Sequence, residues 1–488
     1  MTLVIDGHPF AYEMENLCRL FFPHGGIRTV REESGDGDQI YTGAERRADG
    51  ILLSVRARLG ASERGRKKLL PAGTEDRELE RCMAVELWGM LADLSGVRPA
   101  WGVVTGVRPL KLFGRIARKR GEAGAAAYFR EKLLVSPEKA ELARMTWRNQ
   151  RGLLAQARPD GFSLYVSIPF CPTRCAYCSF VSSSVEKAAR LIPGYVELLC
   201  REIRRTGEIT GGLGLKLQSV YFGGGTPTVL SADQLAEVIR TVRQSFDLTF
   251  CREFTVEAGR PDTVTIAKLA AMRVGGVTRI SINPQTLNDD VLREIGRRHT
   301  TAQTLSAFAL ARRHGFGNIN MDLIAGLPKD TPESFRNTIA GVTALSPESI
   351  TVHTLALKRA ARLNREGGSP GPQGAEAAGE MIAFADGALQ ERGYRPYYLY
   401  RQSRMLGNQE NTGWAKPGFE NLYNVFIMEE CQSILACGAG AVTKLRDPGS
   451  DRIERIFNFK YPYEYISRFA EMMNRKDRVT EFYGTAGG

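Results

Sequence analysis

The stretch YVSIPFCPTRCAYC, residues 165–178, places three thiols within eight residues directly after a short β-rich run. Cys171, Cys175 and Cys178 are separated by four and then by three positions. Thiolates are soft ligands that suit iron–sulfur clusters or zinc. A zinc site would need a fourth cysteine or a histidine nearby, and the nearest histidine in the sequence is His299. The spacing therefore favours a four-iron cluster with one iron left open to a substrate or cofactor, as catalytic zinc sites leave one position open.

Six β-rich runs alternate with amphipathic helical stretches around this motif. The runs are residues 163–168, 218–222, 253–257, 277–282, 319–324 and 349–355. Such alternation predicts parallel strands covered by helices. Because six units do not reach the eight of a closed barrel, we expect an α/β fold built on a partial (β/α)6 barrel. Its chemistry should lie at the carboxyl ends of the strands.

The helical stretches carry start signals. They cover residues 193–206, 232–246 and 332–345. Ser231 is followed three positions later by Gln234, which predicts a capping box, and Thr331 precedes Pro332 at a first helical position.

The flanking regions predict two further parts. Strand patterns at 2–7 and 51–59 and helical patterns at 78–94 and 135–157 indicate an α+β domain over residues 1–160, interrupted by polar, flexible segments at 33–39 and 60–68. The Gly- and Pro-rich stretch 365–380 predicts a loop. We expect three domains: 1–160 of unknown role, the barrel over 161–364, and a substrate-covering domain over 365–488.

Composition narrows the class of protein. The 488 residues are 43% hydrophobic and 25% charged, which excludes disordered and fibrous classes. No apolar run is long enough for a membrane span, and the N-terminus lacks the pattern of a secretory signal, so we expect a cytoplasmic protein. Nine cysteines argue against a disulfide framework. The net charge of +12 suits anionic partners in general, but we expect no nucleic-acid partner.

The cysteine motif resembles that of the radical S-adenosylmethionine superfamily. In that family three such cysteines hold a [4Fe–4S] cluster, and its fourth iron binds the amino and carboxylate groups of S-adenosylmethionine. The resemblance implies a six-unit partial barrel and gives Cys171, Cys175 and Cys178 a catalytic role as cluster ligands. Reduction of the cluster then cleaves the cofactor to methionine and a 5′-deoxyadenosyl radical, which abstracts a hydrogen atom.

Further motifs resemble the oxygen-independent coproporphyrinogen III oxidase family. In that family's order they are YFGGGTPT (221–228), TVEAGRPD (255–262), RISINPQTLND (279–289), GRRHT (296–300) and NMDLIAGLPKDT (320–331). Outside the barrel, TGVRPLKL (105–112) and residues 398–418 and 427–441 look like the HemZ-type coproporphyrinogen dehydrogenase branch.

This resemblance implies a set of cofactor contacts. They are Tyr165 beside the cluster; Gly224, Gly225 and Thr226 along the S-adenosylmethionine site; Glu257, Gln285, Arg297 and Asp322 as polar contacts; and Ala356 at the adenine end. Glycines let the backbone approach a ligand, and the N–H groups of this turn are expected to meet the methionyl moiety. For each polar residue the alternative is a structural ion pair at a strand end.

The implied reaction is oxidative decarboxylation of coproporphyrinogen III, or a related tetrapyrrole, to protoporphyrinogen IX. It implies a reductase or a flavodoxin- or ferredoxin-type electron donor. Some members carry a further cysteine where this chain has Phe180. Haem chaperones also lack that cysteine, so a chaperone that binds haem without turnover and an anaerobic haem-degrading radical enzyme stay as alternatives.

Two other features are further candidates for the site. The polar run 401–411 either covers the substrate or forms a surface loop. The five histidines show no ligand spacing, and His353, on the sixth predicted strand, is the one of interest.

Overall fold

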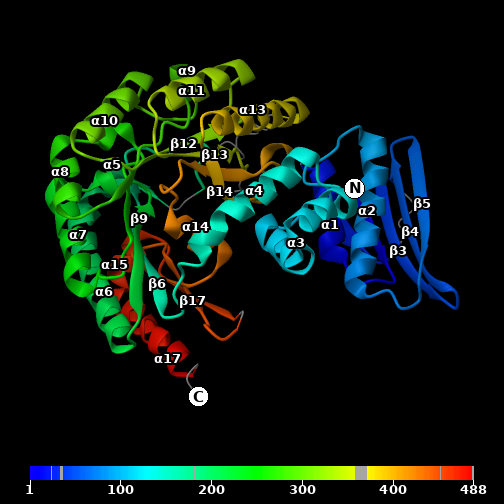
Figure 1. The fold of residues 1–488 in the computed structure, drawn as a ribbon, viewed down its shortest axis with the longest axis horizontal. Coiled ribbons are helices and arrows are strands. Elements are labelled where there is room, and N and C mark those ends of the chain that lie inside the picture. Colours follow the sequence, from blue (N-terminus) through cyan, green and yellow to red (C-terminus); the bar gives the residue numbers. More distant parts are fainter. Residues whose placement is uncertain (24, 33–36, 180–181, 358–370, 451, 486–488) are drawn as a thin grey trace. The chain divides into compact units, whose positions relative to one another are not determined.

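The computed structural model describes residues 1–488 except 24, 33–36, 180–181, 358–370, 451 and 486–488 (Figure 1). Its contacts divide the chain into two compact units. The first comprises Met1–Trp147 with Tyr400–Glu410, and the second comprises Arg148–Leu399 with Asn411–Gly488. The expected boundaries near residues 160 and 364 remain a prediction about domains.

The first unit contains a five-stranded sheet in the order β2-β1-β3-β4-β5. Its elements are β1 (Thr2–Asp6), α1 (Ala11–Phe21), β2 (Arg28–Val30), β3 (Gln39–Arg47), β4 (Gly50–Leu59), β5 (Ser62–Leu70), α2 (Asp76–Ser95), α3 (Pro109–Leu133) and the start of α4 (Pro137–Leu154). Alternate residues of β4, such as Leu53 and Val55, are buried in one core with α1 and α2. The unit is therefore α+β.

Strand β5 corrects the expectation of a flexible segment at 60–68. It pairs with β4 in antiparallel register from Leu59↔Ser62 to Ile51↔Leu70. Within β5 only Leu70 is buried, so the sequence shows no alternation of apolar and polar residues. Charged side chains of this kind are how edge strands avoid pairing with other molecules.

The second unit is built on six parallel strands, as the sequence predicts. They are β6 (Gly161–Ile168), β9 (Lys216–Gly224), β10 (Glu253–Glu257), β11 (Arg279–Ser281), β12 (Ile319–Ala325) and β13 (Ser349–Thr354). They lie side by side in chain order. Figure 1 shows the connecting helices as an arc outside the strands. These helices are α6 (Ile192–Gly212), α7 (Ala232–Ser245), α8 (Ile266–Val274), α9 (Asp289–Glu294), α10 (Thr301–Arg313) and α11 (Pro332–Ala344). The partial (β/α)6 barrel is confirmed.

The predicted helix starts are also confirmed. The Ser231 side chain accepts from Gln234 N, and the Gln234 side chain accepts from Ser231 N, which completes the capping box of α7. Thr331 caps α11 by accepting from Ser334 N.

The C-terminal strands extend the barrel sheet at both edges, to eleven strands in all. They are β14 (Arg395–Tyr400), β15 (Asn411–Ala415), β16 (Ser433–Cys437), β17 (Val442–Arg446) and β18 (Ile453–Phe457). β15 runs antiparallel to β13, and β16 runs parallel to β6. Because these strands supply hydrogen bonds that the edges of an open barrel lack, residues 411–488 form one unit with the barrel.

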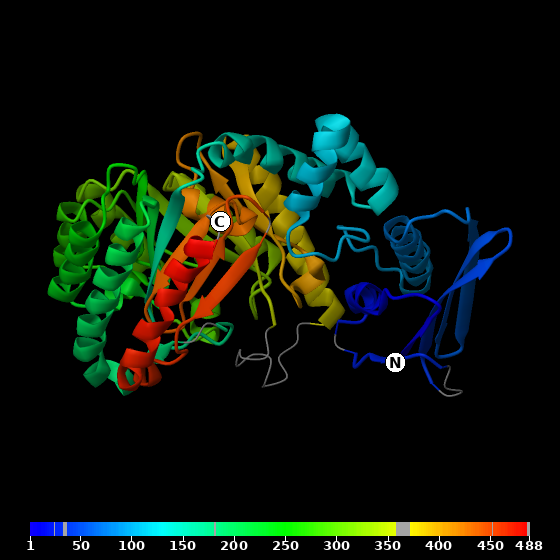
Figure 2. The same ribbon diagram turned by 90° about the horizontal axis from the view of Figure 1, so that it is seen from below.

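The last helices pack on the same unit. They are α14 (Leu422–Glu429), α15 (Pro462–Ser467), α16 (Phe469–Arg475) and α17 (Asp477–Thr485). Figure 2 shows the final helices, in red, alongside the green α6.

The expected loop at 365–380 is corrected in part. Residues 358–370 lie outside the described residues, but Gly371–Glu391 form helix α13. Met381, Ala385 and Leu389 repeat at four-residue spacing and are buried, which gives the helix an apolar face.

Candidate active site

The three clustered cysteines lie in a loop that leaves the carboxyl end of β6. Phe170 and Cys171 form a short parallel pair with Ser183 and Ser184. Ser183 N also donates to Pro169 O at 2.9 Å. Ser183 and Ser184 therefore pair with the start of the cysteine loop, at the carboxyl end of β6, where the sequence predicts the active site.

Donors and cations surround the thiols. The Thr226 hydroxyl lies 3.7 Å from Cys171 Sγ, and Arg260 Nη1 lies 4.0 Å from Cys175 Sγ. Burial raises the pKa of the Cys171 thiol, while hydrogen bonds from Ser182 and Thr226 and the charge of Arg260 lower it. Nearby guanidinium groups stabilise thiolates, which are the forms that bind iron.

A four-iron cluster makes a different demand on the three thiols than a single metal ion does. Within the described part of the chain, no three His, Cys, Asp or Glu side chains converge on one point close enough to hold a single metal ion. Each thiolate of a four-iron cluster binds its own iron, so three thiols on one loop need not converge.

A glycine-rich turn packs against the start of this loop. Gly224 has a φ of 105°, and a Cβ on Gly225 would lie 2.4 Å from Phe170 O. Gly225 N and Thr226 N donate to Ile168 O and Phe170 O, each at 2.8 Å. These two N–H groups therefore donate within the chain, and contact of this turn with the methionyl moiety stays a prediction. The turn fixes the cysteine loop, and its close approach to Phe170 leaves no room for a side chain on Gly225.

Three tyrosines stack inside the barrel beneath this turn. The rings of Tyr165 and Tyr221 lie 6.2 Å apart, and Tyr423 from α14 stacks 4.5 Å from Tyr221 and 5.9 Å from Tyr165. The sequence identified Tyr165 but missed Tyr221 and Tyr423. Tyr221 is placed by its position in β9, whereas Tyr423 comes from a distant helix.

Glu257 ends β10 beside this stack. The Tyr221 hydroxyl donates to Glu257 Oε1 at 2.5 Å. Burial raises the pKa of Glu257 to about 7, and the charge of Asp322 adds to this, while the Tyr221 hydrogen bond opposes it. Its carboxyl group can therefore change charge near neutral pH.

Gln285 and Asp322 are joined through the backbone. Gln285 has a φ of 69° and donates its N–H to Asp322 O at 2.9 Å. Its Oε1 is buried and has no hydrogen-bond partner among the described residues. Holding a non-glycine residue at positive φ costs free energy, and an unsatisfied acceptor beside it indicates a place for a ligand donor.

Asp322 Oδ1 accepts from Asn320 Nδ2 at 2.7 Å, and its Oδ2 lies 3.8 Å from His353 Nε2. Burial raises the pKa of Asp322, but the hydrogen bonds and the charge of His353, with those of Asn320 and Thr351, outweigh it, so the pKa is lowered. Of the two carboxyl groups, the one on Asp322 is therefore ionised near neutral pH, where the one on Glu257 changes charge. His353 does reach the site.

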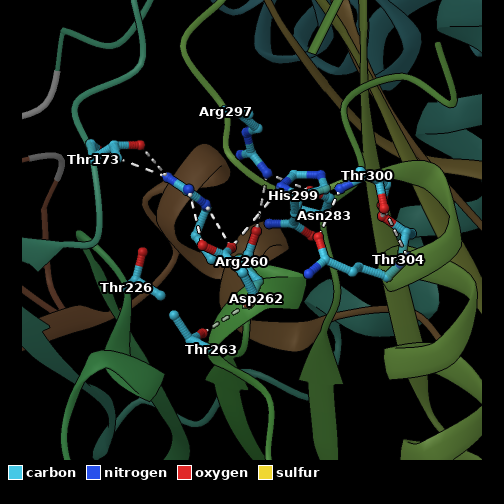
Figure 3. A network of polar contacts seen from close by, with 12 residues as sticks. Thr173, Thr226, Arg260, Asp262, Thr263, Asn283, Arg297, His299, Thr300 and Thr304 are labelled. Atoms are coloured by element: carbon cyan, nitrogen blue, oxygen red, sulfur yellow. Dashed lines mark hydrogen bonds and ion pairs between the residues drawn. The ribbon is translucent and has the colours of Figure 1, made fainter. Parts of the chain in front are cut away.

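Arg297 and Arg260 connect the barrel to the cysteine loop (Figure 3). Arg297 Nη1 donates to Asn283 O at 2.6 Å, and its Nη2 donates to the Tyr177 hydroxyl at 3.2 Å. Arg260 Nη1 donates to Thr173 Oγ1 at 3.0 Å. Arg297 Nε is buried without a partner in the described chain. Sequence reasoning missed Arg260 and Tyr177, although both lie within quoted motifs.

His299 lies beneath these arginines. Burial lowers its pKa to about 3, and the charges of Arg297 and Arg260 lower it further against the opposing charge of Asp262. The imidazole is therefore neutral, and it supplies no charge to the site.

Ala356 follows β13, two residues beyond Thr354. Leu355 N donates to Ala325 O at 3.0 Å, which holds this segment at the carboxyl end of the strands. Of the sequence-predicted residues, Tyr165 and Asp322 lie within β6 and β12, and Glu257 ends β10. Thr226 and Gln285 lie in loops that follow strands, and Arg297 lies between α9 and α10.

Comparisons with known proteins agree with this arrangement. Residues 165–340 match the model of the radical SAM superfamily. The chain is 35% identical to the oxygen-independent coproporphyrinogen-III oxidase-like protein HemZ of Bacillus subtilis, over 96% of this chain and 95% of that protein. The chain belongs to the HemZ family of radical SAM proteins. As a member of this superfamily, it uses a [4Fe–4S] cluster and S-adenosylmethionine.

More distant relatives of this HemZ-family protein have different names. The haem chaperone HemW of Lactococcus lactis is 31% identical over 57% of this chain and 68% of its own. The oxygen-independent coproporphyrinogen III oxidase of Escherichia coli is 31% identical over 58% of this chain and 62% of its own. The crystal structure of the E. coli oxidase HemN matches with a TM-score of 0.52 at 25% identity, covering 66% of this chain and 73% of that one.

Most of the polar run 401–411 of this HemZ-family chain is buried or half-buried, and Ser403 and Arg404 are its exposed residues. Glu410 in the first unit is buried, pairs with Lys139 Nζ at 2.5 Å and accepts from Trp101 Nε1 at 2.7 Å. Arg401 is also buried and donates its N–H to Val107 O at 2.8 Å. These buried contacts hold residues 400–410 in the first unit. Phe180 lies outside the described residues.

Replacing Glu257 or Asp322 with Ala is expected to leave the cluster intact and to weaken S-adenosylmethionine binding about ten- to a hundred-fold. Each change removes one fixed polar partner, and a hydrogen bond to a charged group is worth roughly 1.5–3 kcal/mol. Equilibrium binding to the reconstituted protein measures this effect. Asp233→Ala, in the exposed first turn of α7, is the control. Unchanged affinity in both site variants would assign these carboxylates a structural role.

The raised pKa of Glu257 predicts a pH dependence of stability in the cofactor-free protein. Its pKa rises from 4.5 to about 7 on folding, so folding takes up a proton between these values. The free energy of unfolding should therefore fall as the pH rises from about 4.5 to about 7, by roughly 1–3 kcal/mol from this group. Glu257→Gln cannot titrate and should lose this part of the slope. Urea unfolding at several pH values tests it, and equal slopes in both proteins would contradict it.

Proposed function

We propose that this protein catalyses the oxygen-independent oxidative decarboxylation of two propionate side chains of coproporphyrinogen III, giving the vinyl groups of protoporphyrinogen IX. The observation that carries the proposal is the 35% identity to the coproporphyrinogen-III oxidase-like HemZ over 96% of the chain. The arrangement of thiols, cations and carboxylates at the strand ends supports it chemically.

In this proposal Cys171, Cys175 and Cys178 bind the cluster. When bound, the cluster and S-adenosylmethionine supply abstraction of a hydrogen atom. The S-adenosylmethionine contacts would be Tyr165, Gly224, Gly225, Thr226, Glu257, Gln285, Arg297, Asp322 and Ala356. Asp322, as an ionised carboxylate, suits the ribose hydroxyls or the ammonium group, and the unpartnered Nε of Arg297 suits a carboxylate.

The chain must also hold a substrate C–H bond within reach and keep water away. The stacked rings of Tyr165, Tyr221 and Tyr423 provide a flat apolar surface inside the barrel. The reaction balances when each propionate loses one hydrogen atom from its β-carbon, one CO2 and one electron. The two remaining carbons then become a vinyl group. The cluster must first gain one electron from a low-potential donor, which we propose to be a flavodoxin- or ferredoxin-type carrier or a reductase.

A haem chaperone is the second candidate. The chain is 31% identical to the HemW chaperone of L. lactis over 68% of that protein, and Phe180 stands where some oxidases have a further cysteine. A chaperone would bind haem tightly and release no new porphyrin.

Product analysis separates these two functions. Reconstituted protein is incubated anaerobically with dithionite, S-adenosylmethionine and coproporphyrinogen III, and the porphyrins are measured by mass spectrometry. The oxidase should form protoporphyrinogen with loss of two CO2, and a Cys175→Ala variant should not. Stoichiometric haem binding with no decarboxylated product would support the chaperone and contradict the oxidase.

A further inference from the structure

A cationic hollow lies on the flank of the cysteine loop. Its volume is about 700 Å³, and it is lined by Thr173 and Arg174 of that loop and by residues of the segments 289–293 and 296–300. Thr173 and Arg174 stand between two of the three clustered cysteines. A partner seated in this hollow would therefore touch the loop that carries the thiols.

The hollow is tied firmly to the cysteine loop. Ala176 N donates to Ile295 O at 2.9 Å, and the Thr173 hydroxyl donates to Gly296 O at 3.0 Å. Arg260 Nη1 donates to the same Thr173 hydroxyl at 3.0 Å. Figure 3 shows Thr173 and Arg260 pointing toward one another on one side of Arg297. The lining of the hollow and the thiol loop thus form one hydrogen-bonded body.

The lining is strongly positive. It contains Arg174, Arg293, Arg297 and Arg298, against the single acidic residue Asp289. The side chains of Arg293 and Arg298 are 75% and 66% exposed. Their ion pairs, with Asp290 and Glu186, are also exposed and hold them only weakly. These guanidinium groups are therefore available to an anionic partner.

We propose that this hollow is the docking surface for a small acidic electron-carrier protein that reduces the cluster. The inference rests on the proposed function only in requiring a reducible cluster. Its step is a single electron transfer: the carrier loses one electron, the cluster gains one, and no bond or proton changes.

Three observations favour a protein carrier at this place. The hollow adjoins the thiol loop, and its exposed Arg293 and Arg298 are not among the expected cofactor contacts, although Arg297 belongs to both sets. Its charge complements an acidic rim, and opposite charge speeds encounter between proteins. Redox encounters bury little surface, so a hollow of this size with a few exposed arginines suits such a partner.

The test uses a flavodoxin as probe and the variant Arg293→Glu/Arg298→Glu. Calorimetry measures the affinity of this variant and of wild type for oxidised flavodoxin at several salt concentrations. Stopped-flow absorbance measures bleaching of the cluster by flavodoxin hydroquinone. Both the affinity and the reduction rate should fall about ten-fold or more, and the salt dependence should become shallower. The double Arg→Gln variant should lie between wild type and the Glu variant.

Two controls make the result specific. Arg205→Glu/Arg478→Glu reverses two other exposed, ion-paired arginines on α6 and α17, and it should bind flavodoxin as wild type does. Dithionite, which needs no docking surface, should reduce the cluster of every variant equally. Unchanged flavodoxin affinity in the Arg293→Glu/Arg298→Glu variant, or an equal loss in the control variant, would overturn the proposal. Because neither readout involves a porphyrin, failure of the proposed oxidase reaction would not affect this result.

Discussion

Replacing any one of Cys171, Cys175 or Cys178 with Ala is expected to abolish the visible absorption of the reconstituted cluster and all turnover. A four-iron cluster with three protein ligands cannot lose one of them and keep an iron open for the cofactor. Anaerobic reconstitution, followed by iron analysis and absorbance, measures the loss directly. Wild type should hold about four irons per chain.

The matched controls are Cys251→Ala and Cys431→Ala, which remove partly exposed thiols outside the loop. Both should reconstitute as wild type does. If either lost the cluster as completely as Cys175→Ala, the ligand assignment would be wrong.

Glu202→Ala is expected to destabilise the protein by about 3–5 kcal/mol, because it leaves a buried lysine without its partner. Both side chains are almost fully buried, and Lys476 Nζ lies 2.7 Å from Glu202 Oε1. The carboxylate also accepts from Gly438 N at 2.7 Å and from the Tyr465 hydroxyl at 2.6 Å. Chemical denaturation of the cofactor-free protein measures the loss.

This network also supports the site. Tyr195 accepts from Ala439 N at 2.9 Å and donates to Ser167 O at 2.8 Å, so the turn that Glu202 holds is fixed to the end of β6. The control is Glu208→Ala, on the same helix but 65% exposed. It should change stability by no more than about 0.5 kcal/mol. Equal stability of the two variants would contradict a structural role for Glu202.

The sequence predicted the elements whose signals are local. All six barrel strands appear where the β-rich runs stand, and the cap residues Ser231 and Thr331 start their helices as expected. These signals depend on alternation, turn residues and capping within a few positions. The partial barrel can be inferred from these local signals because each strand pairs with the next strand along the chain.

Elements defined by distant partners could not be predicted in the same way. β5 has no apolar alternation because it is an exposed edge strand, and it is specified by pairing with β4. β16 joins the barrel next to β6, about 270 residues earlier in the chain. Residues 371–391 contain glycines and a proline, yet they form a helix because an apolar face of this helix is buried. In each case tertiary packing outweighs local composition.

The candidate site shows the same difference between residues with local sequence signals and residues brought in from distant parts of the chain. The thiol spacing is local, so Cys171, Cys175 and Cys178 were found at once. Tyr423 approaches the site from a distant helix, and no local pattern marks it. Arg260 lies within a quoted motif, but its contact with the cysteine loop depends on the fold. In the polar run 401–411, for which the sequence left two interpretations open, turn-like composition concealed that Glu410 and Arg401 are buried in the first unit.

The proposed decarboxylation requires abstraction of a hydrogen atom from each reacting propionate β-carbon of coproporphyrinogen III. The direct measurement uses substrate deuterated at those carbons, with dithionite, S-adenosylmethionine and reconstituted protein under anaerobic conditions. Mass spectrometry of the 5′-deoxyadenosine should show deuterium, together with protoporphyrinogen. Deuterium-free 5′-deoxyadenosine without any decarboxylated porphyrin would contradict the proposal.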